Sequence, residues 1–440
     1  MNMNDMEPDV RRLMELVSPK VGLIRGLSKI VRGVEEPNPP VMYQATLSHF
    51  DYRMAPQTER SAAGKGRTES DAIRAALGEA VEHYCASHVN KEVARLASRE
   101  ELPDAVTPPE CVLYSDAQYS GGKVAYHRWQ PQDTLTWTPV RELPTGREVF
   151  APSQLVYLTF TAQREEDFLT TPNSNGLAAG PDIEFAILNG LCELIERDGF
   201  LITWMNKLPT PEVDFDGASD LARSIKAHYA RHGTEIRVFN VSTDIPVYVM
   251  MAMALDKTGE GPAVIVGLGC HLDPRVALDK ALLEICQVRP GETRRYKEEP
   301  PAERLRSYED VRTLEDHGAF LTAPERIGEC SFLLDNGRVQ SIEEMPNHSQ
   351  GNVAEDLKAC VDALKKAGCR VLYADLTTPD VADYGFSVVR AIATGLQPMH
   401  FGHGEERLGG RRLFEVPRTL GHAEDVRVEG DLNPCPHPLA

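Results

Sequence analysis

The chain lacks the marks of membrane, secreted and nucleic-acid-binding proteins. No window approaches the about 18 consecutive apolar residues of a transmembrane helix. The first residues, MNMNDMEPDVRR, are acidic where a signal peptide is basic, and no apolar stretch follows them. Basic residues are in deficit, because 47 lysines and arginines against 66 aspartates and glutamates give a formal charge of −19. A general nucleic-acid binder normally carries a basic face, so we expect neither nucleic acid nor membrane as a partner.

Paired cysteines are also missing. The nine cysteines of the 440 residues are scattered and include no C-x-x-C pair. This is not the spacing of a disulfide framework or a zinc ribbon, so buried thiols and a cytoplasmic location are expected. Cys85/His88 and His400/His403 have metal-like spacing but no matching partner cluster, so we do not expect a zinc site.

Standard catalytic and phosphate-binding motifs are absent. Gly64-Lys65 lacks the earlier glycine of G-x-x-x-x-G-K-[ST], because position 59 is a glutamate. The chain contains no G-x-G-x-x-G, no G-x-S-x-G and no H-E-x-x-H. A nucleotide or metal site would have to be built from other residues.

The chain does contain alternating helical and strand-like patterns, which indicate the α/β (α+β) class. Residues 221–254 and 354–393 share the order helix, glycine, strand, turn, strand. This order predicts a possible internal pseudo-repeat, although simple α/β alternation also produces it. Residues 290–352 are rich in charges of alternating sign. They are expected to form a solvated surface excursion, with a docking surface for a peptide or partner as the alternative.

Three amphipathic helices are expected, over about 70–87, about 182–200, and from Asp273-Pro274 to a stop before Pro290. The first two each carry an E-x-x-E pair, and this spacing places both carboxylates on one helical face. Mg²⁺ prefers oxygen ligands and often bridges carboxylates to phosphates. Lysine and arginine side chains nearby could hold phosphate oxygens. From spacing alone, a solvated helix face remains an equal alternative.

The C-terminus has proline at every second position, at Pro434, Pro436 and Pro438, followed by two residues. Proline fixes φ, so the tail is expected to be stiff and extended. A stiff segment loses little entropy on docking. The tail is therefore either a rigid end without a role or a segment that inserts into a site or a partner groove.

Together these features resemble the YcaO family, from about Val21 to the C-terminus. Three segments are similar to the family's nucleotide motifs, namely GKGRTESDAIRAALGEAVEHY, NSNGLAAGPDIEFAILNGLCELIERDGF and GLGCHLDPRVALDKALLEICQVRP. GLQPMHFGHGEERLGGRRL and the P-x-P-x-P ending resemble the branch that forms azolines in ribosomal peptides. The resemblance implies a YcaO fold with mixed sheets flanked by helices. It also implies an N-terminal segment (1–60) packed on an ATP- and Mg²⁺-binding catalytic domain (61–430), and a proline-rich tail (431–440).

The resemblance further implies roles for individual residues. The implied metal ligands are Glu79, Glu82, Glu193 and Glu196; the implied nucleotide contacts are Lys65, Ser174, Asn175, Glu184, Arg197, Gln287 and Arg289; the implied catalytic tail residues are Pro434, Pro436, Pro438 and Ala440. Two positions depart from the family pattern. Ala76 stands where a serine is common, and His83 stands where an arginine is common.

The implied reaction is cyclodehydration. A Cys, Ser or Thr side chain of a precursor peptide attacks the preceding carbonyl, and ATP phosphorylates the resulting oxygen. Loss of phosphate then leaves a thiazoline or oxazoline. The implied partners are the ribosomal precursor peptide and a separate ThiF-like protein that recognises the leader peptide, since the chain has no room for that domain. A flavin-dependent dehydrogenase is a further candidate partner, and a homodimer or larger synthetase complex is expected.

Two alternatives stay open. The first is thioamide or macroamidine formation within the same family, against which the P-x-P-x-P ending argues. A gene neighbour of the TfuA type, or a requirement for a sulfide source, would argue for it. The second is a non-catalytic scaffold that docks the precursor, against which the four helix carboxylates argue.

Overall fold

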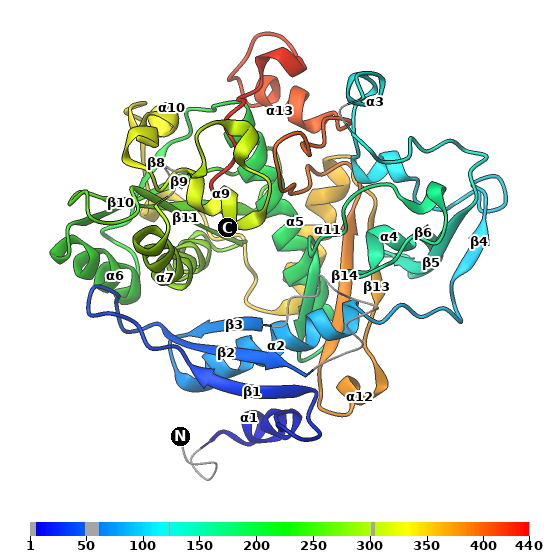
Figure 1. Ribbon diagram of the computed structural model, residues 1–440, viewed down its shortest axis with the longest axis horizontal. Helices are drawn as coiled ribbons and strands as arrows, with labels where there is room; N and C mark the ends of the chain where they lie inside the picture. The colour runs from blue at the N-terminus through cyan, green and yellow to red at the C-terminus, as the bar shows by residue number, and fades with distance from the viewer. Residues whose placement is uncertain (1–5, 49–60, 123, 301–303, 440) are drawn as a thin grey trace.

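The computed structural model describes residues 6–48, 61–122, 124–300 and 304–439, which form a mixed α/β fold of three sheets with helices packed on them (Figure 1). The helices are α1 (Pro8–Leu13), α2 (Glu69–Ala86), α3 (Asp116–Ser120), α4 (Ser153–Val156), α5 (Ile183–Met205), α6 (Asp220–Arg231), α7 (Pro274–Glu298), α9 (Leu314–Phe320), α10 (Ser331–Leu334), α11 (Val353–Lys366), α12 (Pro379–Ala382) and α13 (Arg412–Thr419). The strands are β1 (Ile24–Lys29), β2 (Val41–Leu47), β3 (Ser61–Gly66), β4 (Arg95–Ala97), β5 (Leu135–Glu142), β6 (Arg147–Pro152), β7 (Leu177–Gly180), β8 (Glu212–Asp214), β9 (Thr234–Asn240), β10 (Tyr248–Asp256), β11 (Val264–His271), β12 (Val339–Ser341), β13 (Val371–Asp375) and β14 (Ser387–Ala393). The predicted α/β class is confirmed.

The first sheet has the antiparallel order β1-β2-β3 and packs against α2. A Cβ added at Gly64 would lie 2.0 Å from the backbone nitrogen of Ala76, so only glycine fits there. The hydroxyl of Thr68 caps α2 by accepting a hydrogen bond from the Asp71 N–H at 3.1 Å. Ala76, one of the two departures from the family pattern, is thus a packing position at the tightest strand–helix contact.

The second sheet has the order β11-β10-β9-β8-β12, with α5 on one face and α6 and α7 on the other. On β10, Met251 and Met253 face α5, whereas Met250 and Ala252 face α7. Because both faces are covered, the strand is apolar at every interior position rather than alternating. The third sheet has the order β4-β5-β13-β14-β7, with β6 paired to β5, and α5 also packs on β14 and β7. The long helix α5 therefore lies at the centre of the molecule (Figure 1).

The two stretches of the expected pseudo-repeat have matching local structures. In the first, α6 is followed by Gly233 with φ +73° and by the antiparallel pair β9–β10. In the second, α11 is followed by Gly368 with φ +86° and by the antiparallel pair β13–β14. Both glycines occupy the left-handed region that ends a helix. The order helix, glycine, strand, strand is as predicted.

The third predicted helix does not end where the sequence suggested. We expected a stop before Pro290, but α7 continues to Glu298. Glu292 and Thr293, both beyond the proline, are buried, and Glu292 accepts a hydrogen bond from Arg295 at 2.5 Å. Proline normally interrupts a helix, and here burial and ion pairing on both sides of Pro290 keep the helix intact.

The segment 290–352 also differs from a solvated excursion. Its first part belongs to α7, and apolar side chains further along, such as Leu305, Phe320 and Leu333, are buried in the main core. The alternating charges lie between these anchor points. The division of the chain at residues 60 and 430 stays a prediction.

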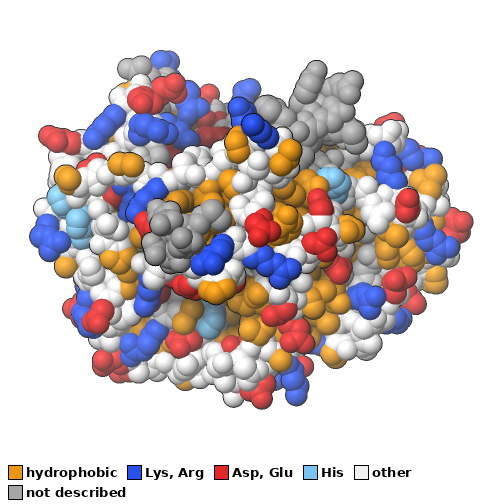
Figure 2. All heavy atoms as spheres, turned by 90° about the horizontal axis from the view of Figure 1, so that it is seen from below, with side chains coloured by type: hydrophobic (Ala, Val, Ile, Leu, Met, Phe, Trp, Pro, Cys, Tyr) orange, Lys and Arg blue, Asp and Glu red, His pale blue; other side chains and the backbone are white. Residues whose placement is uncertain are grey.

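Charged side chains of both signs are interspersed over the face around α1 and the first sheet (Figure 2). All nine cysteines have free thiols, and all but Cys111 are buried. No helix among the described residues is long and apolar enough to span a membrane.

Candidate functional site

Three strand–helix units place a glutamate in the same way. In each, the carboxylate of a helix residue accepts a hydrogen bond from a backbone N–H at the preceding strand. Glu79 on α2 accepts from Ala63 at 3.0 Å, and Glu193 on α5 accepts from Gly176 at 2.8 Å. Glu284 on α7 accepts from Leu268 at 2.9 Å. The recurring bond fixes the rotation of each helix, and so fixes where its other acidic residues point.

Each of these glutamates is followed three residues later by a second polar side chain, which is Glu82 on α2, Glu196 on α5 and Gln287 on α7. The E-x-x-E pairs predicted from the sequence therefore have a third counterpart, E-x-x-Q, on α7. Sequence analysis gave Glu284 no role. The signal that points to it is its position three residues before Gln287, which repeats the spacing of the two E-x-x-E pairs.

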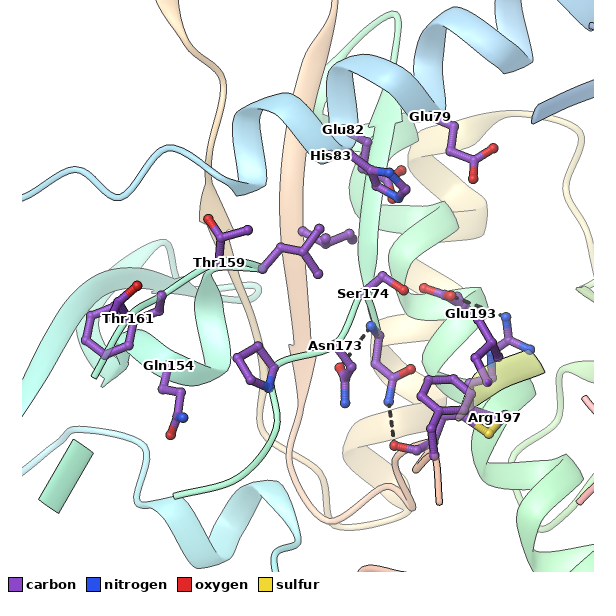
Figure 3. Close-up of a pocket in the computed structure, with 18 of the residues that line it drawn as sticks. Glu79, Glu82, His83, Gln154, Thr159, Thr161, Asn173, Ser174, Glu193 and Arg197 are labelled. Carbon is purple, nitrogen blue, oxygen red and sulfur yellow. Dashed lines mark hydrogen bonds and ion pairs between the residues drawn. The ribbon is translucent and has the colours of Figure 1, made fainter. Parts of the chain in front are cut away.

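A cavity of about 960 Å³ lies between α2 and α5 (Figure 3). At one end it is lined by the carboxylates of Glu79, Glu82 and Glu193, by Arg197, and by the loop that carries Ser174 and Asn175. The rest of its lining is largely apolar and comprises Leu158, Phe160, Ala162, Phe168, Pro172, Leu314, Met399, Phe401 and Leu439, with Thr159 and Thr161 among them. One cavity thus combines a cluster of carboxylates, its acidic end, with a largely apolar lining.

Negative charge is under-compensated at the acidic end. Burial raises the pKa of Glu196 to about 8, with Glu284 and Glu193 adding to the effect and Arg197 opposing it. Glu82 keeps some exposure into the cavity, yet desolvation, Glu193 and Glu79 raise its pKa well above the usual range. Arg197 contacts Glu193 at 3.4 Å and Glu196 at 3.5 Å. Several carboxylates thus share few cations.

This donor set fits Mg²⁺, a hard cation with oxygen ligands, because a divalent ion would supply the missing positive charge. Among the described residues, no group of three or more His, Cys, Asp or Glu side chains is arranged as a complete metal site. The carboxylates would therefore share the ion with oxygens of another molecule, as Mg²⁺ does with substrate phosphates. The four glutamates stay predicted ligands.

The acidic end leads to a pH prediction. At neutral pH the raised pKa keeps a proton on Glu196, and a carboxyl group must lose that proton to bind a metal. The affinity for preformed Mg²⁺·AMPPCP should therefore rise from about pH 7 to about pH 8.5, with proton release on binding. Calorimetry in buffers of different ionisation enthalpy measures both effects. The Glu196→Gln variant should show a weaker dependence, carried by Glu82, whose pKa is also raised. The exposed Glu148→Gln should keep the full dependence, and a flat wild-type profile would contradict the assignment.

Arg390 on β14 holds the loop beside the carboxylates. Its Nε donates to the carbonyl of Val156 at 2.9 Å, its Nη2 donates to that of Asn173 at 2.7 Å, and its Nη1 donates to that of Asn175. It is 3% exposed, and its charge lowers the pKa of Glu82 against the effect of burial. Sequence analysis missed this residue. A single arginine within the apolar strand SVVRAIA was the available signal.

Replacing Arg390 by lysine tests this clamp. Lysine keeps the charge beside Glu82 but cannot bond three carbonyls in a planar fork. We expect the dissociation constant for Mg²⁺·AMPPCP to rise about tenfold, since the loop with Ser174 and Asn175 loses its anchor. Calorimetric titration measures it, with Arg141→Lys on an exposed strand position as the matched control. Equal affinity in Arg390→Lys and wild type would show that the loop needs no clamp.

The predicted nucleotide contacts do not all meet at this cavity. Ser174, Asn175 and Arg197 line it, whereas Lys65, Glu184, Gln287 and Arg289 do not. Gln287 donates to the carbonyl of Ala63 at 3.1 Å and lines a separate cavity of about 560 Å³. These seven assignments stay predictions.

The positions of Arg289 and Glu184 differ most from those expected of nucleotide contacts. Arg289 forms a buried ion pair with Glu36 and donates to the hydroxyl of Thr234 at 3.2 Å. Glu184 is exposed in the first turn of α5. Arg289 is thus engaged by the protein, and phosphate binding there would require it to leave a buried carboxylate.

His83, the second departure from the family pattern, lines the cavity beside Glu82 (Figure 3). Burial lowers the pKa of His83 to about 4. A neutral imidazole therefore stands where the family pattern commonly has an arginine.

The C-terminal tail is inserted into the fold. Pro436 and Pro438 are buried, Leu439 lines the cavity, and Pro434 is exposed. The indole of Trp204 donates to the carbonyl of Cys435 at 2.9 Å, which anchors the tail to α5. The tail is therefore packed into the fold and reaches the cavity through Leu439. Ala440 lies outside the described residues, and the catalytic role of the tail stays a prediction.

Comparisons with known proteins place the chain in a family. Residues 63–397 match the family model described as YcaO cyclodehydratase, ATP- and Mg²⁺-binding. The match covers well over half of the chain, so the protein belongs to the YcaO family. ATP and Mg²⁺ are accordingly its cofactors.

Individual proteins are also similar to this chain. An uncharacterised protein of Methanothermobacter thermautotrophicus is 29% identical over 355 residues, covering 79% of this chain and 84% of the relative. An uncharacterised protein in the tfuA 3′ region of Rhizobium leguminosarum bv. trifolii is 30% identical over 165 residues, covering 35% of this chain and 39% of the relative. A solved heterocyclase in complex with substrate and cofactor is 27% identical, with a TM-score of 0.82. It aligns with 98% of this chain, which spans 57% of that longer chain.

Proposed function

We propose that this protein is an ATP- and Mg²⁺-dependent cyclodehydratase that converts Cys, Ser or Thr residues of a ribosomal precursor peptide into thiazolines or oxazolines. One observation carries the proposal: Leu439 of the proline-rich tail lines the same cavity as the E-x-x-E carboxylates of Glu79, Glu82 and Glu193. The tail ending is the feature that separates azoline-forming members from the rest in the family resemblance. The similarity to a solved heterocyclase supports the same reaction class.

The residues of the cavity suit this chemistry. Mg²⁺·ATP, when bound, supplies the phosphoryl group that makes an amide oxygen a good leaving group. The glutamates of α2 and α5 would hold the metal, and Arg197 would balance phosphate charge from one side. The apolar lining, which includes Phe160, Phe401 and Leu439, would exclude water from the activated peptide and so suppress hydrolysis.

We propose further that a ThiF-like protein supplies leader-peptide recognition, and that the two form a synthetase complex with the precursor. The solved heterocyclase was determined in complex with its substrate, which supports complex formation with a precursor peptide. A homodimer and a flavin-dependent dehydrogenase that oxidises azolines complete the proposed assembly. Its location is proposed to be the cytoplasm, given the nine free thiols.

The test is to combine this protein, its candidate partner, a precursor peptide and ATP, and to follow the peptide by mass spectrometry. The expected result is a loss of one water mass per ring that depends on ATP and Mg²⁺. An intact peptide mass with every candidate partner would refute the proposal. Calorimetry with Mg²⁺·AMPPCP separates an enzyme from a non-catalytic scaffold, which should give no binding heat.

One observation favours a second candidate, peptide thioamide formation. The relative from the tfuA 3′ region is 30% identical, although it aligns with only 35% of this chain. Adding a sulfide source to the same reaction distinguishes the two. A thioamide replaces one oxygen by one sulfur and raises the peptide mass, whereas an azoline lowers it.

A further inference from the structure

One wall of the cavity is assembled from three separate parts of the chain. Leu314 comes from α9, Met399 and Phe401 come from the loop after β14, and Leu439 comes from the tail. None of these segments is continuous with another in the sequence. Something must therefore hold them in register for the wall to keep its shape.

His317, one turn after Leu314 on α9, lies behind this wall and is 1% exposed. Its Nε2 accepts a hydrogen bond from the backbone N–H of Gly402 at 2.9 Å. Because a backbone N–H can only donate, Nδ1 must carry the imidazole proton. Nδ1 therefore donates to the backbone carbonyl of His437, which lies 2.8 Å away. One imidazole thus bonds the loop on one side and the tail on the other.

Ring contacts reinforce these bonds. The rings of His317 and His437 stack with their centroids 4.0 Å apart and their planes inclined by 20°. The Nε2 of His437 in turn lies 2.8 Å from the carbonyl of His400, to which it donates. The three segments are therefore joined in a closed set of contacts with His317 at its centre. Burial lowers the pKa of His317 to about 4, in keeping with the neutral tautomer.

We propose that His317 is a positioning residue that fixes the end of the tail and the 399–402 loop as one wall of the active-site cavity. It touches no reacting group. It acts through Leu439, Met399 and Phe401, whose side chains reach the cavity. Its effect on turnover rests on the proposed function, but its effect on the tail does not.

The first test measures the tail directly and needs no substrate. His317→Phe keeps an aromatic ring for stacking and removes both hydrogen bonds, while His317→Gln retains a donor and an acceptor. Each full-length variant is treated with a broad-specificity carboxypeptidase, and its intact mass is followed. We expect wild type to resist removal of Leu439, His317→Phe to lose it at least about tenfold faster, and His317→Gln to fall between. Two lost hydrogen bonds suffice for a change of this size.

The matched control is His403→Phe, the same substitution at an exposed position of the same loop. Melting temperatures are recorded for all variants to confirm that they fold. If His317→Phe does not fold, the trimming rate of His317→Gln is compared with that of wild type instead. A trimming rate in folded His317 variants equal to that of wild type and His403→Phe would overturn the proposal.

The second test asks whether His317 acts through the tail. His317→Phe is combined with deletion of residues 434–440, and kcat is measured for each single and double variant. In the tail deletion the bond from His317 to the tail is already absent and only its bond with Gly402 remains, so the loss in the double variant should be clearly smaller than the product of the two single losses. Residues in one contact network are non-additive in this way, whereas independent structural damage multiplies. Multiplicative losses would contradict the proposal, even if cyclodehydration itself were confirmed.

Discussion

Replacing Glu193 by glutamine should lower the rate of ring formation about a thousandfold or more while leaving the protein folded. Glutamine has the same shape as glutamate, and its side-chain oxygen can still accept the Gly176 N–H that Glu193 bonds at 2.8 Å. The strand–helix contact therefore survives. What is lost is the charge beside Glu82 and Arg197 that would hold Mg²⁺. Initial rates with partner, precursor and ATP measure the effect.

A second ligand variant and a control variant show whether the loss of activity is specific to the predicted metal ligands. Glu79→Gln keeps the equivalent bond to the Ala63 N–H and should lose activity to a similar extent. Glu148→Gln, at an exposed strand position outside the cavity, should behave as wild type. Mg²⁺·AMPPCP titration should show weakened binding in the first two and normal binding in the third. Activity of Glu193→Gln within a few-fold of wild type would exclude a metal role for this carboxylate.

Removing residues 434–440 should abolish cyclodehydration, with a loss of about a hundredfold or more. The deletion takes away Leu439 from the cavity lining and the Cys435 carbonyl that Trp204 bonds. It also exposes the rings of Phe200 and Trp204, which the tail covers. Removing Leu439 and Ala440 alone should do less harm, because the anchored part of the tail stays in place. Reaction rates and melting temperatures of both truncations measure the difference.

A variant with a replaced tail shows whether activity needs the specific contacts of the tail or only a segment of the same length. Exchanging the seven tail residues for glycine and serine keeps the length but removes the stiffness of three prolines and the contacts of His437. This variant should be as inactive as the full deletion. Wild-type activity in either variant would refute the role assigned to the tail.

The sequence was most informative where structure is local. Helical spacing predicted α2 over 70–87, and the helix spans Glu69–Ala86, because capping and an apolar stripe act within a few residues of each other. The same spacing predicted the E-x-x-E pairs, of which Glu79, Glu82 and Glu193 line one cavity in the structure and Glu196 does not. Local sequence signals were wrong at Pro290, where we expected α7 to stop and the helix continues to Glu298. The contacts that keep α7 continuous there involve Glu36, hundreds of residues earlier in the chain.

The sequence could not predict the features that depend on contacts between residues far apart in the chain. The alternating prolines predicted a stiff tail but not its direction, since its anchor, Trp204, is 231 residues from Cys435. Arg390 and His317 were missed for the same reason. Each bonds segments far apart in the chain, and nothing within a short window of sequence reports such a contact. Composition was informative only about classes of partner: the charge of −19 argued against nucleic acid and said nothing of the carboxylates that share one cavity.

The central claim is that this protein activates a peptide carbonyl by phosphorylating its oxygen. It is tested most directly with a precursor in which the backbone carbonyl of the residue immediately before the cyclised Cys, Ser or Thr carries a heavy-oxygen label. The reaction is run with partner, Mg²⁺ and ATP, and the released phosphate is examined by mass spectrometry or phosphorus NMR. The account predicts one labelled oxygen in the phosphate for each ring formed, and none with Glu193→Gln. Ring formation that releases only unlabelled phosphate would contradict it.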